Sequence, residues 1–317
     1  MTLPSQGVIA TYWIPDVGIG PQDKMQHVHV PLLDVLKFPT NVVFLGFARF
    51  TSQSTPYLTI PDELMKEMTL QPGQARTNVQ ELQAAGIKVL LSVQGLRGYG
   101  WDNISDPAGF AKWVQEVVIE QYGLDGIDID NEWSDVTDKY QDFMNAIGAL
   151  RASLTGSLLT KALWTDMQYF KTPVAEGFPN AGRYLGQLLD FGGEMTYTGD
   201  VRSMANRIAW YHNVVVNGKN VGMGWNQLLI GVQAGPDGKS NFTNIDVVYD
   251  VAKWSVEPVS DRKSTPPILG IMLYTFSQDI QQFTYKEQNK KMFPDADDHQ
   301  WHRTIVAGIT GKPKPDH

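Results

Sequence analysis

The sequence predicts an α/β fold, a single-domain (β/α)8 TIM barrel, on three observations. Eight apolar, β-branched runs recur along the 317 residues, with segments of helical spacing between most of them. Most runs are continuously apolar rather than alternating, which is typical of parallel strands covered on both faces. The length suits one closed barrel, and no repeat, low-complexity tract or interdomain linker divides the chain. We therefore expect a barrel over residues 1–311 and a frayed tail over residues 312–317.

The individual elements follow from the same periodicities. The expected strands cover residues 7–13, 41–47, 88–93, 126–130, 158–163, 190–196, 228–232 and 269–276. The expected helices cover residues 74–85, 107–121, 137–154, 201–216, 245–256 and 298–309. Asp106-Pro107 and the segment 134–138 supply helix starts.

Composition excludes several functional classes. The chain carries 26 basic and 34 acidic residues, a net charge of -8 with no basic stripe, which argues against nucleic acid or an anionic membrane as partner. No stretch approaches the roughly 18 apolar residues of a membrane span. Because cysteine is absent, disulfides, thiolate metal sites and cysteine nucleophiles are excluded. The first residues lack a signal-peptide pattern, and we expect a monomeric protein, secreted with its signal removed rather than cytoplasmic.

An acidic run on the fourth strand is the strongest functional signal. In extended backbone Asp128, Asp130 and Glu132 point to one face, while Ile127 and Ile129 point to the other. A solvated acidic edge strand is the plain alternative, but the apolar half of the alternation indicates an internal strand. Like-charged carboxyls in contact cannot all ionise, so at least one should keep its proton near neutral pH. Such a proton is available for general acid catalysis.

Polar and aromatic residues follow the other strands, and in a barrel of this kind the carboxyl ends of the strands form the catalytic mouth. Single aromatic residues more often belong to a core, but a shared location at the mouth favours a sugar site, because a pyranose offers C–H faces and a rim of hydroxyls. The residues expected at the mouth are Tyr12, Trp13, Phe47, Arg49, Ser92, Gln94, Trp164, Asp166, Gln168, Tyr197, Asp200, Gln233, Tyr274 and Asp279.

Other chemistries fit the sequence less well. The acidic run could hold Mg²⁺ or Ca²⁺, but it lacks the glycine of a calcium-binding loop, and its alternate residues are isoleucines. The segment 238–240 (Gly-Lys-Ser) lacks the earlier glycine of a phosphate loop. No metalloprotease or serine-hydrolase motif occurs. We therefore expect no metal and no cofactor.

The run from Asp125 to Glu132 matches in full the D-G-x-D-x-D-x-E signature of the family 18 glycoside hydrolases, which include chitinases and endo-β-N-acetylglucosaminidases. Three other segments resemble motifs of the family less closely, and they occur in the family's order along the chain. Residues 88–95 resemble the family's S-x-G-G strand, with Gln94 in place of a glycine, and residues 195–197 resemble its M-x-Y-D segment, with Thr198 in place of the aspartate. Residues 270–274 resemble the last G-x-M-x-W strand, with Tyr274 in place of the tryptophan.

The resemblance implies a role for each site residue, in a substrate-assisted mechanism with retention of configuration. Glu132 would be the acid and then the base, Asp130 would orient the substrate's acetamido N–H, and Asp128 would share a proton with Asp130. Tyr197 would bind the acetamido carbonyl, while Asp125 would be structural. The residues expected to bind substrate are Tyr12, Phe47, Gln94, Trp133, Trp164, Gln168, Gln233 and Tyr274.

The departures from the signature bear on the substrate. Asn131 followed by Trp133, together with Tyr274, resembles the endo-β-N-acetylglucosaminidases that cut the GlcNAc-β-1,4-GlcNAc core of N-glycans. The expected partner is therefore an N-acetylglucosamine-containing glycan or glycoprotein. A chitinase and a silent glycan-binding relative are the alternatives, and the intact Glu132 argues against the second. The long segment 49–73 is expected to form part of the glycan groove.

Overall fold

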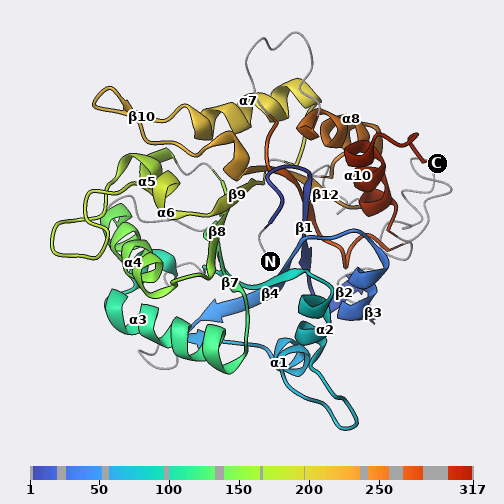
Figure 1. The fold of residues 1–317 in the computed structure, drawn as a ribbon, viewed down its shortest axis with the longest axis horizontal. Helices are drawn as coiled ribbons and strands as arrows, with labels where there is room; N and C mark the ends of the chain where they lie inside the picture. The colour runs from blue at the N-terminus through green and yellow to red at the C-terminus, as the bar shows by residue number, and fades with distance from the viewer. Residues whose placement is uncertain are drawn as a thin grey trace.

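The structure is a computed structural model that describes residues 3–19, 26–51, 57–95, 100–132, 139–164, 167–195, 197–235, 242–256, 267–280 and 299–315. Eight parallel strands form its central ring (Figure 1). They are β1 (Val8–Trp13), β4 (Val42–Phe50), β6 (Lys88–Gln94), β7 (Gly126–Asp130), β8 (Leu158–Leu163), β9 (Phe191–Glu194), β12 (Leu228–Gln233) and β13 (Gly270–Tyr274). Because β1 pairs with both β13 and β4, the sheet closes on itself, and the predicted (β/α)8 barrel is confirmed.

The strands separate two apolar cores. A smaller cluster fills the inside of the barrel and includes Ala10, Phe44, Leu90 and Met272. A larger cluster lies between the outer faces of the strands and the helices. Each strand is buried on both faces, which explains the continuous apolar runs. The chain enters the base of the barrel near Leu3, which packs against the inner cluster.

Helices surround this ring on all sides (Figure 1). The α-helices are α1 (Asp62–Met68), α2 (Asn78–Ala84), α3 (Pro107–Trp113), α4 (Tyr140–Ser153), α5 (Met167–Lys171), α6 (Leu185–Leu188), α7 (Val201–His212), α8 (Ile245–Val256) and α10 (Gln300–Thr310). The π- and 3-10-helical segments are η2 (Leu32–Lys37), η3 (Trp101–Asn103), η4 (Val114–Gln121) and η5 (Trp225–Gln227). Within the described parts of the chain, no helix combines the length and apolarity needed to cross a membrane.

Capping residues decide where two of the expected helices begin. Thr77 and Gln80 form a capping box, so α2 begins after Thr77 rather than at residue 74 as expected. Asp106 accepts a hydrogen bond from the Gly109 amide at 2.9 Å and starts α3 as predicted, with Pro107 in the first turn. The other expected start, 134–138, lies outside the described residues.

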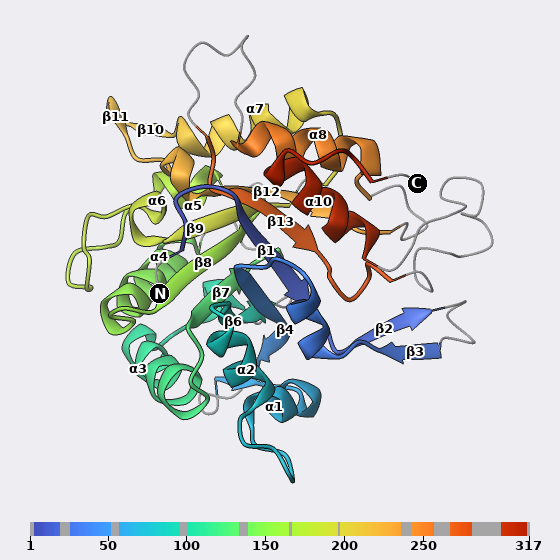
Figure 2. The ribbon, with the colours of Figure 1, turned by 45° about the vertical axis from the view of Figure 1, so that its right-hand side comes forward.

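Two hairpins were not predicted. The strands β2 (Asp16–Ile19) and β3 (Gln26–His29) project from the barrel wall (Figure 2). The strands β10 (Val215–Val216) and β11 (Lys219–Asn220) form the other. Its turn residues Asn217 and Gly218 both have positive φ, the conformation that an Asn-Gly pair favours in a two-residue hairpin. The helix expected over residues 201–216 therefore ends at His212.

The segment 49–73 is not the open loop that was expected. Its described residues form a strand, β5 (Leu58–Thr59), antiparallel to β4, and then α1. Leu58, Leu64 and Met68 are buried in the outer core, because they cover the outer face of the barrel. Most of this segment therefore belongs to the scaffold rather than to a glycan groove. Residues 52–56 lie outside the described residues.

The tail after α10 is docked rather than frayed. The Tyr249 hydroxyl of α8 donates to the Lys312 carbonyl at 3.0 Å, and Lys314 forms an ion pair with Asp246 of the same helix. Gly311 has a φ of 66°, which ends α10 in a left-handed turn and directs the chain back toward α8. Residues 312–315 thus continue the packing of the barrel.

Candidate active site

The carboxylates of β7 divide by the strand alternation as the sequence predicts. Asp128 and Asp130 are 1% and 2% exposed, whereas Ile127 and Ile129 belong to the outer core. Glu132 follows the end of β7 and its side chain is exposed. The two aspartates are therefore buried within the barrel, and the glutamate reaches the solvent at the carboxyl end of the strand.

Asp128 is surrounded by hydroxyl donors. Oδ2 accepts from the Tyr12 hydroxyl and the Ser92 hydroxyl, both at 2.8 Å, and Oδ1 accepts from Thr160 Oγ1 at 2.7 Å. Ser92 and Thr160 lie beside Asp128 in the strand register, which explains why they meet it. Burial raises the pKa of Asp128, and these three hydrogen bonds oppose the rise.

Asp130 is the carboxyl most strongly biased toward its protonated form. Burial, and then the nearby charges of Glu132 and Asp128, raise its pKa well above the ordinary value. Glu132 is thus close enough to Asp130 for its charge to act on that carboxyl. Among the described residues Asp130 forms no hydrogen bond with Asp128, and the expected sharing of a proton between the two aspartates stays a prediction.

One atom of this group stands out. Oδ1 of Asp130 is buried and has no hydrogen-bond partner among the described residues of the chain. A buried polar atom without a partner is costly, and such atoms in proteins usually meet a water, an ion or a ligand. The position of Oδ1 at the carboxyl end of β7 makes a ligand N–H or O–H a suitable partner.

Tyr197 and Tyr274 form one wall of the site. Their rings are stacked, with centroids 5.7 Å apart and planes 19° apart. Burial first, and then the proximity of Tyr274 and of the carboxylates Asp130 and Glu132, raise the pKa of Tyr197 well above its ordinary value. The pKa of Tyr274 is raised in the same direction by burial and by the same two carboxylates. Both hydroxyls therefore stay protonated and can donate hydrogen bonds beside Asp130.

Tyr12 and Phe47 lie next to this wall. The Tyr12 ring is 5.7 Å from both Tyr274 and Phe47, and it is 2% exposed. The strand register shifts between Leu45 and Ala48, and half-buried Phe47 packs against the inner cluster. Tyr12 thus lies within the barrel as a hydrogen-bond donor to Asp128, whereas Phe47 remains partly accessible.

The two amides expected at the mouth lie on opposite sides of it. Gln94 is half-buried at the end of β6, in register with Asp130. Gln233 is 7% exposed at the end of β12, in register with Tyr274. The Gln233 backbone amide donates to Thr243 Oγ1 at 3.0 Å, and that hydroxyl donates to the Tyr197 carbonyl. Thr243 thus links Gln233 to Tyr197, the residue predicted to bind the acetamido carbonyl.

The remaining substrate-binding predictions have different outcomes. Trp164 follows β8 and is 43% exposed, and Gln168 in α5 is exposed. Trp133 and Asp166 lie outside the described residues. An exposed indole beside a polar site is a surface that a sugar ring can stack on.

Three residues expected at the mouth serve the scaffold instead. Trp13 is fully buried in the outer core, where its indole N–H donates to the Val30 carbonyl at 2.9 Å. Since Tyr12 faces inward, its neighbour must face outward. Asp200 caps α7 by accepting from the Ser203 amide at 2.8 Å. Asp279 accepts from the amides of Trp301 and His302 in α10.

Asp125 has the structural role that was expected. Its Oδ2 accepts from the Val89 amide at 3.0 Å and from Gln83 Nε2 at 2.9 Å, and its Oδ1 forms an ion pair with Lys88 at 2.5 Å. These contacts fix the base of β7 against β6 and α2. The signature's first aspartate therefore positions the strand that carries the other three acids.

Sequence reasoning missed two ionic groups on the outer side of the barrel. Glu194 is buried at the end of β9 and pairs with Arg207 of α7, with Nε 3.2 Å from Oε1. Arg207 also donates to the Thr198 carbonyl at 2.9 Å, directly after Tyr197. A charged residue inside the otherwise apolar run of β9 was the available signal.

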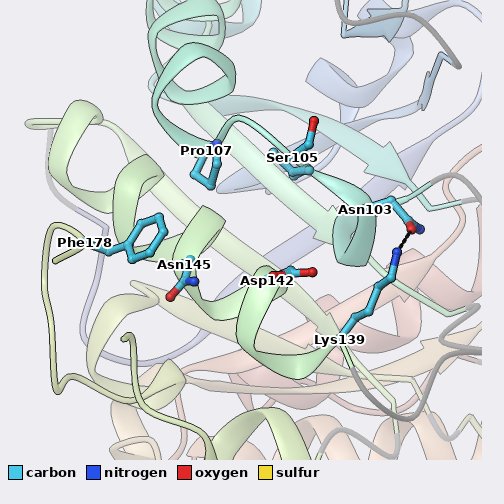
Figure 3. A pocket seen from close by; sticks show the side chains of 8 residues that line it. Asn103, Ser105, Pro107, Lys139, Asp142, Asn145 and Phe178 are labelled. Carbon is cyan, nitrogen blue, oxygen red and sulfur yellow. Dashed lines mark hydrogen bonds between the residues drawn. The ribbon is translucent and has the colours of Figure 1, made fainter. Parts of the chain in front are cut away.

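A pocket on the flank of the barrel is separate from this site (Figure 3). Its volume is about 180 Å³, and Lys139 donates to Asn103 Oδ1 across its edge at 2.5 Å. Its lining comes from the starts of α3 and α4 and from the loop before α6, namely Asn103, Ile104, Ser105, Pro107, Lys139, Asp142, Asn145 and Phe178. None of the residues predicted to act on substrate lines it.

The raised pKa of Asp130 predicts a cost to stability. A carboxyl whose pKa is higher in the folded state favours folding at pH values below its unfolded pKa, and this advantage is lost as pH rises through the folded pKa. Asp130→Asn is neutral at every pH, so its free energy of unfolding should exceed that of the wild type at pH 7. The difference should shrink as pH falls. Urea unfolding at several pH values measures it, and a difference independent of pH would contradict the assignment.

Comparison with known proteins agrees with this geometry. No protein-family model matches the chain. An endo-β-N-acetylglucosaminidase from Flavobacterium sp. (strain SK1022) is 32% identical over 126 residues, which cover 37% of this chain and 38% of that protein. The match thus spans well under half the length of that relative.

Solved structures resemble the chain over nearly its whole length. A family 18 chitinase from Pseudoalteromonas aurantia superimposes with a TM-score of 0.63 at 19% identity, covering 95% of this chain and 99% of the other. A mutant endo-β-N-acetylglucosaminidase from Cordyceps militaris, in complex with fucosyl-N-acetylglucosamine-Asn, superimposes with a TM-score of 0.58 at 18% identity, covering 96% and 91%. The fold of this chain is therefore the barrel found in family 18 glycoside hydrolases, as the sequence resemblance predicts.

Proposed function

We propose that the chain is a glycoside hydrolase that cuts the GlcNAc-β-1,4-GlcNAc bond in the core of N-glycans by substrate-assisted catalysis. The observation that carries the proposal is the arrangement at the end of β7. There an exposed Glu132 lies close to a buried Asp130, whose pKa is raised well above its ordinary value by burial and then by the nearby charges of Glu132 and Asp128. In such a pair Glu132 can transfer a proton at the surface of the site, and Asp130 below it can interact with charge that develops on the substrate.

Each step assigns a proton to a named group. Glu132 donates its proton to the glycosidic oxygen as the bond from that oxygen to the anomeric carbon breaks. The carbonyl oxygen of the substrate's own 2-acetamido group attacks that carbon from the opposite face and forms an oxazolinium ion. Glu132, now a carboxylate, takes a proton from water. The water oxygen attacks the anomeric carbon and breaks its bond to the acetamido oxygen, which opens the oxazolinium ring. Two inversions give net retention, and Glu132 ends protonated as it began.

Asp130 and Tyr197 would hold the acetamido group. The buried Oδ1 of Asp130 can accept the acetamido N–H, which gains acidity as positive charge develops on the ring. The Tyr197 hydroxyl, whose raised pKa keeps it protonated, can donate to the acetamido oxygen. Asp128, which accepts hydrogen bonds from three hydroxyls, lies below Asp130 on the same face of β7.

A protein nucleophile fits the site less well than the acetamido group. Three of the described carboxylates at or after the ends of other barrel strands are engaged elsewhere: Glu194 pairs with Arg207, and Asp200 and Asp279 cap helices. A retaining two-carboxylate mechanism needs a second carboxyl about 5 Å from the acid, across the anomeric carbon. The engagement of these three residues supports attack by the substrate itself.

The preference for an N-glycan core rests on finer features. Asn131 and Tyr274 depart from the residues typical of chitinases, and the curated relative from Flavobacterium sp. carries the name endo-β-N-acetylglucosaminidase. A chitinase remains the second candidate because chitinases are among the proteins that share the fold over nearly the whole chain. A silent glycan-binding protein is disfavoured by the intact Glu132. Export and a monomeric state stay predictions.

Mass spectrometry of products distinguishes these candidates. The protein is incubated with a high-mannose glycoprotein, a complex-type glycoprotein and chitin oligomers. The proposal predicts that a glycoprotein loses its glycan and keeps one GlcNAc per site, while chitin oligomers are cut slowly or not at all. Rapid cleavage of chitin oligomers alone would favour the chitinase. Binding to all three without any product would favour a lectin.

A further inference from the structure

Three polar side chains are buried directly behind Glu132, on the outer side of the barrel. Asn131 Nδ2 donates to the Tyr169 hydroxyl at 3.3 Å, and that hydroxyl donates to Asp102, lying 2.9 and 3.0 Å from its two carboxylate oxygens. The three residues are 3–5% exposed and come from the end of β7, from α5 and from η3. We call them the Asn131 cluster.

The Asn131 cluster is also tied to the end of β6, through the peptide before Asn131 and through the Asn131 side chain. The Gly95 amide donates to the Asp130 carbonyl at 2.8 Å. A Cβ added at Gly95 would lie 3.0 Å from Asn131 Oδ1, so the amide packs closely against the end of β6. Asn131 is thus held through its side chain and through the peptide that precedes it. Because Glu132 is the next residue, these contacts also restrict the position of its backbone.

The cluster contains an ionisable group, Asp102, although it lies in a mostly apolar layer. Burial raises the pKa of Asp102, and its hydrogen bond from Tyr169 acts in the opposite direction. Lys161 on β8, which is 1% exposed, and Lys139 at the start of α4 also favour the charged carboxylate. A buried polar group of this kind is seldom the most stable way to fill such a space, but it fixes one geometry.

We propose that the Asn131 cluster positions Glu132 for proton transfer, with Tyr169 and Asp102 acting through Asn131. The inference rests on the proposed function, because it concerns the acid of the same site. Protonation of the leaving oxygen requires the Glu132 carboxyl within hydrogen-bond distance of it and aligned with it. Substrate binding is predicted to depend instead on other side chains at the mouth, such as Trp164, Phe47 and Gln94, none of which belongs to the cluster.

This role has a chemical signature. A glycan leaving group needs a proton, whereas a dinitrophenolate leaves without one. Loosening Glu132 should therefore slow hydrolysis of the natural glycoside far more than hydrolysis of a dinitrophenyl glycoside of the same glycan. A merely structural loss would reduce both rates together, in proportion to the folded fraction.

The test replaces Tyr169 by phenylalanine, which removes the hydroxyl and keeps the ring that packs on Phe143 at 4.4 Å. Tyr211→Phe is the matched control, since Tyr211 is a tyrosine of similar burial in the helical layer, on α7. For Tyr169→Phe we expect kcat on the glycoprotein to fall between about 10- and 100-fold with little change in KM. On the dinitrophenyl glycoside kcat should stay within about twofold of wild type. Tyr211→Phe should leave both rates unchanged.

The failures of the two proposals are distinguishable. If Glu132→Gln hydrolyses the glycoprotein at the wild-type rate, the proposed function fails. If Glu132→Gln is inactive but Tyr169→Phe behaves like Tyr211→Phe, or slows both substrates equally, only the positioning role is overturned. Should Tyr169→Phe fold poorly by circular dichroism, Asn131→Leu provides the same comparison, because it fills a similar volume and cannot bond to Tyr169 or Asp102.

Discussion

Replacing Glu132 by glutamine should reduce hydrolysis of the glycan by about 10²- to 10⁴-fold, the usual contribution of a positioned general acid. The amide keeps the shape of the side chain and removes the transferable proton. Because Glu132 is exposed beyond the end of β7, the substitution should leave the fold and the affinity for glycan nearly unchanged. Initial rates and calorimetric binding of the same glycoprotein measure both quantities.

The matched control for this experiment is Glu63→Gln, on the outer helix α1, where Glu63 is exposed and distant from β7 in the chain. It should retain the wild-type rate. Turnover by Glu132→Gln within tenfold of the wild-type rate would remove Glu132 from the role of acid.

Replacing Asp130 by asparagine should reduce hydrolysis by about 10²- to 10³-fold, as expected when one preorganised group that stabilises a developing charge is lost. The substitution keeps a hydrogen-bonding group of the same shape but removes the charge that supports the oxazolinium ion. A supplied sugar oxazoline enters the pathway after the slow step. Asp130→Asn should therefore still transfer that sugar to an acceptor, and the product should persist because its hydrolysis is slow.

The comparison of two reactions in one variant makes the Asp130 experiment informative. Equal loss of hydrolysis and of oxazoline transfer would indicate a damaged site rather than a missing charge. Transfer and hydrolysis can both be followed by mass spectrometry of the acceptor glycopeptide. Greater stability of the same variant at pH 7, predicted above from the raised pKa, would rule out misfolding as the cause.

The barrel was predictable because each strand can be recognised from residues that are adjacent in the sequence. Most of the eight strands are runs of apolar residues buried on both faces, so their positions can be predicted without knowing which strands pair. The short elements were missed because tertiary packing decides them. Leu58 and Leu64, for example, are buried against the barrel, although the sequence around them is rich in proline and polar residues.

The site was predictable along one strand and not between strands. Alternation alone assigns Asp128 and Asp130 to the inside, and the same alternation should have assigned Trp13 to the outside once Tyr12 faced inward. The hydroxyls around Asp128 come from three other strands, and only the register brings them together. Local periodicity does not predict which side chains from different strands lie in contact.

The Asn131 cluster is the clearest case of this limit. Tyr169 and Asp102 lie 67 residues apart, and no motif joins them. Asn131 itself was visible as a polar residue at an outward position of a buried strand, where an apolar residue is usual. A buried amide needs partners, so its position alone indicates that polar groups approach from neighbouring loops. It does not indicate which ones.

A thiazoline analogue of the N-acetylglucosamine oxazoline tests the central claim most directly, because it has the shape of the intermediate that the acetamido group alone can form. The measurement is its inhibition constant against hydrolysis of the glycoprotein. Substrate assistance by the site at the end of β7 predicts competitive inhibition at concentrations far below the substrate's KM, weakened in Asp130→Asn. A wild-type enzyme that hydrolyses the glycoprotein and is not inhibited by the thiazoline would contradict this mechanism.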